Sequence, residues 1–242
     1  KPEALPPVQP PAGPDPTHID PDPEVSDDVD TPQRAQPMLL EIGWEVCNKM
    51  GGIYTVLRTK VPSMMARWGQ RYCLVGPYNH DSAQIEFEPA TPEEMDTPIG
   101  QAVRQMREMG FGAEYGRWLV MGKPQVVLLH VNDVKRYLAD IKFRLWADHQ
   151  IPVPDGDPLI DDVVAFGEAV RLLMSNLAQR EAPRRDLIAH FHEWMAGVAI
   201  PMLRKEHWPG STVFTTHATL LGRYLAMSNP AFYEHLPYLD AH

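Results

Sequence analysis

The sequence predicts an α/β protein built on a Rossmann-like parallel sheet with helices on both faces. Two observations predict it. Short apolar segments bounded by Gly, Pro or charged residues suit buried strands, and they recur from residue 38 to residue 215. Between several of them, apolar residues return every three or four positions, as in an amphipathic helix. Strands that alternate with helices form crossover units, which makes the strands parallel and places the helices on the two faces.

The first predicted strand covers residues 38–42, a short and mostly apolar run that suits a buried position. Gly51 and Gly52 then open a helical pattern with apolar residues on one face. Pro62 is expected to interrupt this helix, because proline cannot donate the helical hydrogen bond. Residues 72–75 predict the second strand, which a Gly-Pro pair closes.

The middle of the chain alternates between polar and apolar stretches. Residues 80–98 are rich in acidic residues and Pro, and we expect a loop there. Apolar residues at helical spacing predict a helix over 103–110, ending at a glycine. Two strands are expected at 115–121 and 125–131, on either side of a Gly-Lys-Pro turn.

The last third carries the strongest helical pattern of the chain. Residues 163–177 place six large apolar side chains on one face, and a loop at 155–158 precedes them. The remaining predicted elements are strands at 187–191 and 212–215, a helix at 195–204 and a helix from about residue 218.

Composition excludes several classes of protein. The chain has 242 residues, 44% of them hydrophobic, and a net charge of −10. Negative charge argues against non-specific nucleic-acid binding, which depends on clustered Lys and Arg. No apolar run approaches the roughly 20 residues that span a bilayer, so we expect no membrane partner. Cys47 and Cys73 form no disulfide framework, and we expect two reduced thiols in a cytoplasmic protein.

Residues 1–37 differ sharply from the rest of the chain. Eight acidic and two basic residues give this stretch a net charge of −6, and Pro and Asp dominate it. It has few apolar residues to bury, so nothing offsets its ordering entropy. We therefore expect a disordered tail at 1–37 and a folded domain at 38–242. Such a tail can bind a partner or be solvated, and its composition favours a solvated extension.

Three polar segments follow predicted strands, at the edge where parallel sheets bind ligands. The first contains Lys49, Gly51 and Gly52. Adjacent glycines let the backbone approach a ligand, and the helix N-terminus that follows offers free N–H groups and positive partial charge. With the charge of Lys49, the segment suits a diphosphate, and the alternative is an ordinary strand-to-helix turn. It matches neither the dinucleotide-binding fingerprint nor a Walker motif.

The second segment is AHFHEWMAG, residues 189–197. On a strand, His190 and His192 project to the same side, so they could supply two metal ligands. No third Cys or His follows at an informative spacing, and the sequence predicts no metal site. Two alternatives remain for these residues. One is a histidine hydrogen-bonded in the core, with Trp194 packed at the strand end, and the other is a neutral histidine that contacts sugar hydroxyls.

The third segment, residues 214–224, is dense in hydrogen-bond donors. His217 and Arg223 lie close enough in sequence to face one crevice across a loop and a first helical turn. Arginine suits phosphate because its planar fork donates two parallel hydrogen bonds. The alternative makes Thr216 or Thr219 a helix cap and Arg223 a surface charge, and the residues alone favour neither.

Complete catalytic motifs are absent from the sequence. It contains no nucleophile elbow, no zinc-protease helix motif and no Cys-His pairing. No carboxylate is singled out as a general base. The chain therefore offers binding groups rather than a reaction centre, and we assign no catalytic residue and no cofactor.

A resemblance to a known family is carried by EVCNKMGGIYTVLRTK (45–60), LVGPYN (74–79), YGRWLVMGKPQVVLL (115–129), AHFHEWMAGVAIP (189–201) and FTTHATLLGRYLA (214–226). These segments resemble glycogen synthase of the animal and fungal type, glycosyltransferase family 3, over roughly residues 38–242. That family folds as two Rossmann-like domains around a cleft, the GT-B architecture. The resemblance implies that this chain is the N-terminal domain. The catalytic glutamate, most of the nucleotide pocket and the arginines that sense glucose 6-phosphate would lie in a C-terminal domain absent from this chain.

The resemblance also implies roles for individual residues. Lys49 resembles the basic residue that contacts the diphosphate of the bound nucleotide. His217 and Arg223 resemble the pair that contacts the nucleotide sugar, and His192 would lie near the glucose. The residues expected to bind the donor are Lys49, Gly51, Gly52, His192, His217 and Arg223.

The implied reaction transfers glucose from UDP-glucose to the 4-hydroxyl at the non-reducing end of glycogen or another α-1,4-glucan, with retention of configuration. Positive groups at the diphosphate and preorganised polar contacts at the glucose would serve it without a metal. The resemblance implies a homo-oligomeric full-length protein, of which this half alone would be inactive. Two alternatives stay open: a non-catalytic fragment that binds glycogen or a synthase chain, and a related α-glucan synthase that uses ADP-glucose.

Overall fold

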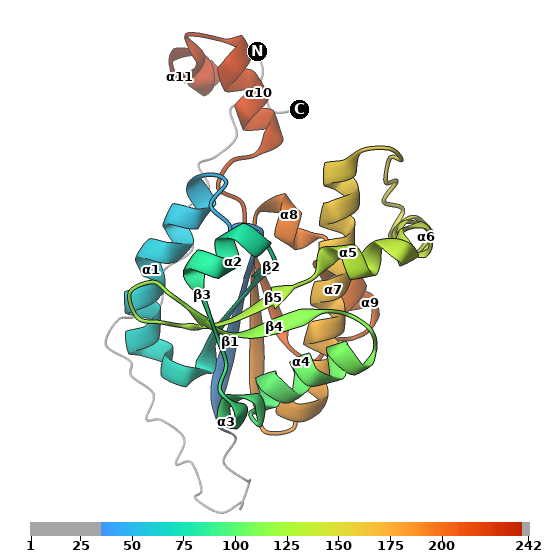
Figure 1. The fold of residues 1–242 in the computed structure, drawn as a ribbon. Helices are drawn as coiled ribbons and strands as arrows, with labels where there is room; N and C mark the ends of the chain where they lie inside the picture. Colours follow the sequence, from blue (N-terminus) through green and yellow to red (C-terminus); the bar gives the residue numbers. More distant parts are fainter. Residues whose placement is uncertain (1–34, 239–242) are drawn as a thin grey trace, which may run out of the picture. The chain divides into compact units, whose positions relative to one another are not determined.

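The computed structural model describes residues 35–238, apart from the side chains of Leu220, Leu221 and Arg223. Over this range the chain forms a seven-stranded sheet in the order β3-β4-β5-β2-β1-β6-β7 (Figure 1). The tail predicted at 1–37 lies outside the described residues up to residue 34. The strands are β1 (Ala35–Gly43), β2 (Tyr72–Pro77), β3 (Phe87–Pro89), β4 (Ala113–Trp118), β5 (Gln125–Leu129), β6 (Arg185–His192) and β7 (Ser211–Thr215).

The sheet is parallel except at one edge. β1 pairs in parallel with β2 and β6, β2 with β5, and β6 with β7. β4 runs antiparallel to β5, and β3 antiparallel to β4, so a purely parallel sheet is wrong there. The reason is the short β4–β5 turn, in which Gly122 has a φ of 97° and Lys123 a φ of 40°. A parallel pair would need a crossover of about a dozen residues or more.

The helices are α1 (Gly52–Trp68), α2 (His80–Glu86), α3 (Pro92–Met95), α4 (Pro98–Glu108), α5 (Val131–Val134), α6 (Leu138–His149), α7 (Pro158–Glu181), α8 (Glu193–Gly197), α9 (Ala199–Lys205), α10 (Leu220–Ser228) and α11 (Phe232–His235). Short 3-10 turns cover Gly69–Arg71, Lys135–Tyr137 and Leu236–Tyr238. Among the described residues, none of these helices is long and apolar enough to cross a bilayer.

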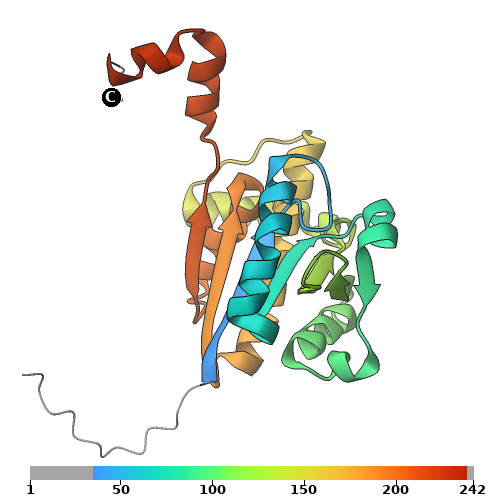
Figure 2. The same ribbon diagram turned by 90° about the vertical axis from the view of Figure 1, so that its left-hand side faces the viewer.

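Two hydrophobic cores lie on the two faces of the sheet, and the alternation along β1 explains both. Leu40 and Ile42 pack in the core shared with α4 and α7. Leu39 points the other way and packs in the core that contains Leu57 and Val61 of α1. Figure 2 shows α1 lying along its face of the sheet. The predicted α/β class, with helices on both faces, is confirmed.

Several local predictions are wrong at the N-terminal end. β1 begins at Ala35 rather than at residue 38, and the Ala35 N–H donates to the Arg184 carbonyl at 3.0 Å. α1 continues through Pro62 instead of stopping there. A proline removes one helical hydrogen bond, but α1 buries Leu57 and Val61 against the sheet, and this burial holds the helix together on both sides of the proline.

The predicted loop at 80–98 contains α2, β3 and α3. Local caps start both helices: Asn79 accepts from the Ser82 N–H, and Thr91 forms a capping box with Glu94. Further along, the predicted helix at 195–204 is two helices, α8 and α9, on either side of residue 198. α5 and α6 have no counterpart in the sequence prediction.

α10 and α11 pack on each other and project beyond the carboxyl end of β7 (Figure 2). Within this segment Tyr224, Met227 and Tyr233 are exposed, at 68%, 88% and 83%. β7 itself exposes Val213 and Phe214. This part of the described chain therefore carries apolar surface of the kind that contacts other protein.

Candidate functional site

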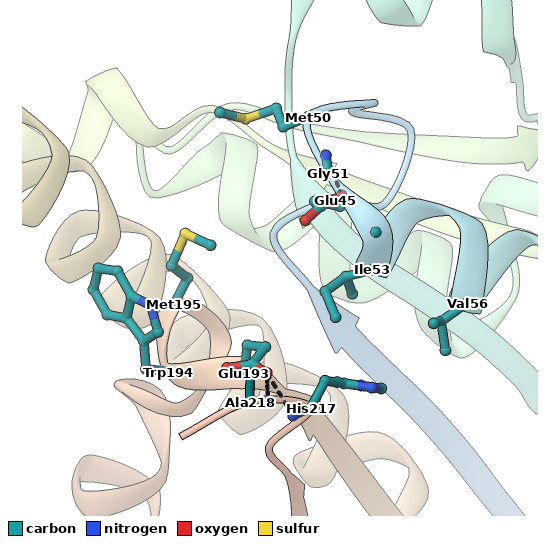
Figure 3. A pocket seen from close by; sticks show the side chains of 11 residues that line it. Glu45, Met50, Gly51, Ile53, Val56, Glu193, Trp194, Met195, His217 and Ala218 are labelled. Carbon is teal, nitrogen blue, oxygen red and sulfur yellow. Dashed lines mark hydrogen bonds between the residues drawn. The ribbon is translucent and has the colours of Figure 1, made fainter. Parts of the chain in front are cut away.

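A cleft opens at the carboxyl edge of the sheet, where β1, β6 and β7 end. Its volume is about 650 Å³, and three chain segments line it, one after each strand (Figure 3). Parallel sheets bind ligands at this edge, so the cleft lies where the three sequence motifs predict a site. The side chains and backbone that matter most are Glu45, Gly51 and Gly52 after β1, Glu193 and Trp194 after β6, and His217 after β7.

A carboxylate caps the N-terminus of α1. Glu45 is buried, and its Oε2 accepts hydrogen bonds from the N–H groups of Gly51 at 2.7 Å and Tyr54 at 3.0 Å. The N-cap residue, Gly51, has no side chain that could do this. Within the described part of the chain, the N–H groups of Gly52 and Ile53 meet no acceptor. An anion in the cleft can therefore still bind at this helix end.

The two glycines of this segment differ in the space around them. A Cβ on Gly51 would lie 3.0 Å from Oε1 of Glu45, which is tighter than an ordinary contact. A Cβ on Gly52 would meet nothing within 4 Å. The backbone of Gly52 is thus open to the cleft, whereas Gly51 is needed for the cap.

A second carboxylate holds the segment after β7. Oε1 of Glu193 accepts hydrogen bonds from the N–H groups of His217 at 2.5 Å and Ala218 at 3.0 Å, drawn as dashed lines in Figure 3. Glu193 is buried and has a φ of 63°, a left-handed conformation that costs a non-glycine residue about 1–2 kcal/mol. The two hydrogen bonds offset this cost and hold His217 at the wall of the cleft.

Behind the cleft, Glu41 of β1 is fully buried and charged. Its carboxylate contacts the Lys60 ammonium, the Tyr72 hydroxyl and, at 2.5 Å, Nε2 of His192. Burial alone would raise the pKa of this carboxyl, but hydrogen bonds from His192, Lys60 and Tyr72 outweigh it and lower the pKa to about 2. Burial and the same carboxylate raise the pKa of Tyr72 well above its usual range.

The contacts continue from Glu41 to the cleft. His192, at the end of β6, is 3% exposed, and its Nδ1 lies 3.1 Å from Nε2 of His217. The two rings are stacked, with their centroids 5.4 Å apart. Since His217 lines the cleft, a continuous line of polar contacts joins the buried carboxylate to the ligand-accessible surface.

His190 and His192 project to the same side of β6, with ring centroids 4.2 Å apart, as strand geometry predicts. Nε2 of His190 lies 2.8 Å from Oγ1 of Thr215, and burial, together with the neighbouring His192, lowers the pKa of His190 to about 4. With Glu41, the two histidines bring three possible metal ligands within 4.8 Å of one another. The Lys60 ammonium already balances Glu41, however, and a metal ion would have to displace it. The contacts favour hydrogen-bonded histidines over a metal site.

The sequence matches a known family over most of its length. Residues 41–242 match the family described as glycogen synthase. This chain belongs to the glycogen synthase family. The glycogen (starch) synthase of Neurospora crassa is 42% identical over 206 residues, covering 84% of this chain and 28% of that protein. Isoform 1 of Saccharomyces cerevisiae is 39% identical over 211 residues (84% and 30%), and the liver protein of Homo sapiens 37% over 199 residues (82% and 28%).

The chain spans less than a third of the length of these glycogen synthases. Among the residues predicted to bind the donor, Gly51, Gly52 and His217 line the cleft. His192 lies behind His217 rather than in the cleft wall. The core-histidine alternative therefore describes His192, while any contact with the donor passes through His217.

The other two predicted residues are placed less directly. Lys49 is exposed in the loop before α1 and is not among the residues that line the cleft. Arg223 belongs to α10, and its side chain lies outside what the structure describes. Thr219 caps α10 by accepting from the Gly222 N–H at 3.0 Å, so the capping alternative for this threonine is confirmed.

Four charged residues of the site were missed by sequence reasoning. Glu41 had a signal, because a lone carboxylate in an otherwise apolar strand is buried only with a partner. That partner, Lys60, lies on a different element and cannot be identified from spacing. Glu45 and Glu193 carry no local signal, since each accepts from backbone N–H groups that the tertiary structure brings to it.

Proposed function

We propose that this chain is the donor-binding N-terminal domain of a glycogen synthase. Such an enzyme is a retaining glucosyltransferase that moves glucose from UDP-glucose to the 4-hydroxyl at the non-reducing end of an α-1,4-glucan. One observation supports the proposal above the others. Three strand-to-helix junctions converge on one cleft, with the N-terminus of α1 and the imidazole of His217 in its wall. The names of the relatives, glycogen (starch) synthase, support the glucan product.

In this proposal the N-terminus of α1 binds the diphosphate. The N–H groups of Gly52 and Ile53 and the positive end of the helix attract an anion. Glu45 repels one at the same helix end, because its carboxylate already accepts from Gly51 and Tyr54. The exposed ammonium of Lys49, in the adjoining loop, offsets that repulsion. The diphosphate would therefore lie on the Gly52 side of the helix end.

The glucose would lie against His217. Transfer needs charge stabilisation at the leaving diphosphate and fixed polar contacts at an oxocarbenium-like sugar. His217 supplies one such contact, and Glu193 holds it in place through the backbone. The remaining groups would come from the part of a glycogen synthase that this chain does not span. Closure of that part over the cleft would exclude water and limit hydrolysis of the donor.

The same proposal places the protein in the cytoplasm. Cys47 and Cys73 are both free and buried, which suits a reducing compartment. Burial raises the pKa of Cys73 to about 12, so this thiol stays protonated and inert. A homo-oligomeric full-length protein remains a prediction from the resemblance.

The test uses the full-length protein and measures transfer of labelled glucose from UDP-glucose into glycogen. We expect His217→Ala to lower kcat/KM about 100-fold, the usual scale for losing one preorganised polar contact. His149→Ala is the matched control, because His149 ends α6 and does not line the cleft. Unchanged transfer by a folded His217→Ala protein would refute the assignment. Turnover of ADP-glucose instead would favour the alternative donor, and glycogen binding without any transfer a non-catalytic role.

A further inference from the structure

The buried contacts behind the cleft have a direction. An ionised carboxylate only accepts hydrogen bonds, and three groups meet the oxygens of Glu41. They are the ammonium of Lys60, the hydroxyl of Tyr72 and Nε2 of His192. Lys60 and Tyr72 have protons to donate. His192 must do the same to make its hydrogen bond, so its proton lies on Nε2.

This proton decides the next contact. A neutral imidazole has one N–H, so protonation at Nε2 leaves Nδ1 of His192 as an acceptor. Nε2 of His217 lies 3.1 Å from that atom and therefore donates to it. A second proton on His192 is disfavoured, because its ring is 3% exposed and Lys60 already balances Glu41. His190 is adjacent, and it makes its own hydrogen bond with Thr215.

We propose that Glu41 is a positioning residue that fixes the protons of both rings, so that His217 offers an unprotonated Nδ1 to the cleft. This atom accepts a hydrogen bond from a hydroxyl group of the bound ligand. With the opposite arrangement His217 would donate, and it would favour a phosphate oxygen. The choice of a sugar hydroxyl as the donor rests on the proposed function, whereas the arrangement of the protons does not.

The first test is the tautomer of each ring in the ligand-free chain. Nitrogen–proton correlation spectra of protein labelled at histidine report it directly, and His217→Gln assigns the His217 signals. Near neutral pH we expect both rings to carry their proton on Nε2, in more than about tenfold excess over the other tautomer, the bias expected of a hydrogen bond to a charged acceptor. A His217 ring protonated at Nδ1, alone or together with Nε2, would overturn the proposal.

Three variants separate the acceptor from general packing. Glu41→Leu removes the acceptor, and we expect the two tautomers of His217 to become populated within about threefold of each other. Glu41→Gln keeps an acceptor oxygen in the same place, and Tyr72→Phe removes only a donor from the other carboxylate oxygen. Both should retain the wild-type tautomers. If Glu41→Leu does not fold, these two spectra and the wild-type spectrum decide, and redistribution in either variant contradicts the proposal.

The second test concerns the ligand and uses calorimetry on the full-length protein. Glu41→Leu should weaken the binding of UDP-glucose about tenfold and leave the binding of UDP, which has no glucose, unchanged. Equal losses for both ligands would overturn the role of His217 as a sugar acceptor. The tautomer spectra need no ligand, so failure of the proposed function would leave them unaffected. Conversely, normal transfer by His217→Ala would refute the proposed function alone.

Discussion

Glu193 tests whether a hydrogen-bonded carboxylate in a strained turn builds the wall of the cleft. Glu193→Ala removes two hydrogen bonds to a charged acceptor, each worth about 1.5–3 kcal/mol. Both bonds share one oxygen, and water can reach the exposed His217 segment, so we expect a loss of about 2–3 kcal/mol in total. Glu193→Gly loses the same bonds but relieves the φ of 63°, which returns about 1 kcal/mol. Glu193→Gln keeps an acceptor oxygen and should lose less than about 1 kcal/mol.

The assay is urea unfolding of the chain and its three variants, followed by tryptophan fluorescence. The midpoints should fall in the order wild type, Gln, Gly, Ala, with the same dependence on urea because the exposed surface is unchanged. UDP-glucose should bind more weakly to both the Gly and the Ala variants, because His217 is no longer held. An Ala variant as stable as wild type would refute the role of the carboxylate. A Gly variant less stable than Ala would refute the strain.

The remaining predictions concern stability and pH. Pro62→Ala should stabilise the chain by up to about 3 kcal/mol, because residue 62 regains a helical hydrogen bond, and a lower urea midpoint would contradict this. Gly52→Ala should leave the midpoint within about 1 kcal/mol yet weaken UDP-glucose binding, and unchanged affinity would show that no ligand approaches there. Gly76→Ala should lose about 1–3 kcal/mol, because its Cβ would lie 2.7 Å from that of Val46, and an unchanged midpoint would contradict this clash. The folded pKa values of His190, about 4 against 6.5, and Glu41, about 2 against 4.5, are both lowered, so the unfolded chain binds more protons and stability falls on acidification from about pH 6.5 to pH 2. Urea midpoints of His190→Gln should lose the upper part of this fall, from about pH 6.5 to 4, and an unaltered profile would count against the lowered pKa of His190.

The elements that sequence reasoning located are those with a strong local pattern. The long apolar face of α7 and the apolar runs of β1, β2 and β6 are short-range features, and the structure has each of them. The elements that it missed are short and polar. α2 and α3 depend on caps made by single side chains, and three-residue β3 forms only because β4 pairs with it. Pro62 was misjudged because burial of one helix face outweighs a local propensity.

The sequence by itself determined the class of the fold, the family and the edge of the sheet where the site lies. It could do so because apolar periodicity, Gly-rich junctions and family motifs are written in neighbouring residues. Tertiary structure alone decided which groups meet at that edge. Glu41 and His192 lie 151 positions apart, and the acceptors of the cleft wall bind N–H groups that belong to other segments. A charge in a buried site is stable only with partners from several elements, and folding, rather than spacing along the chain, brings those partners together.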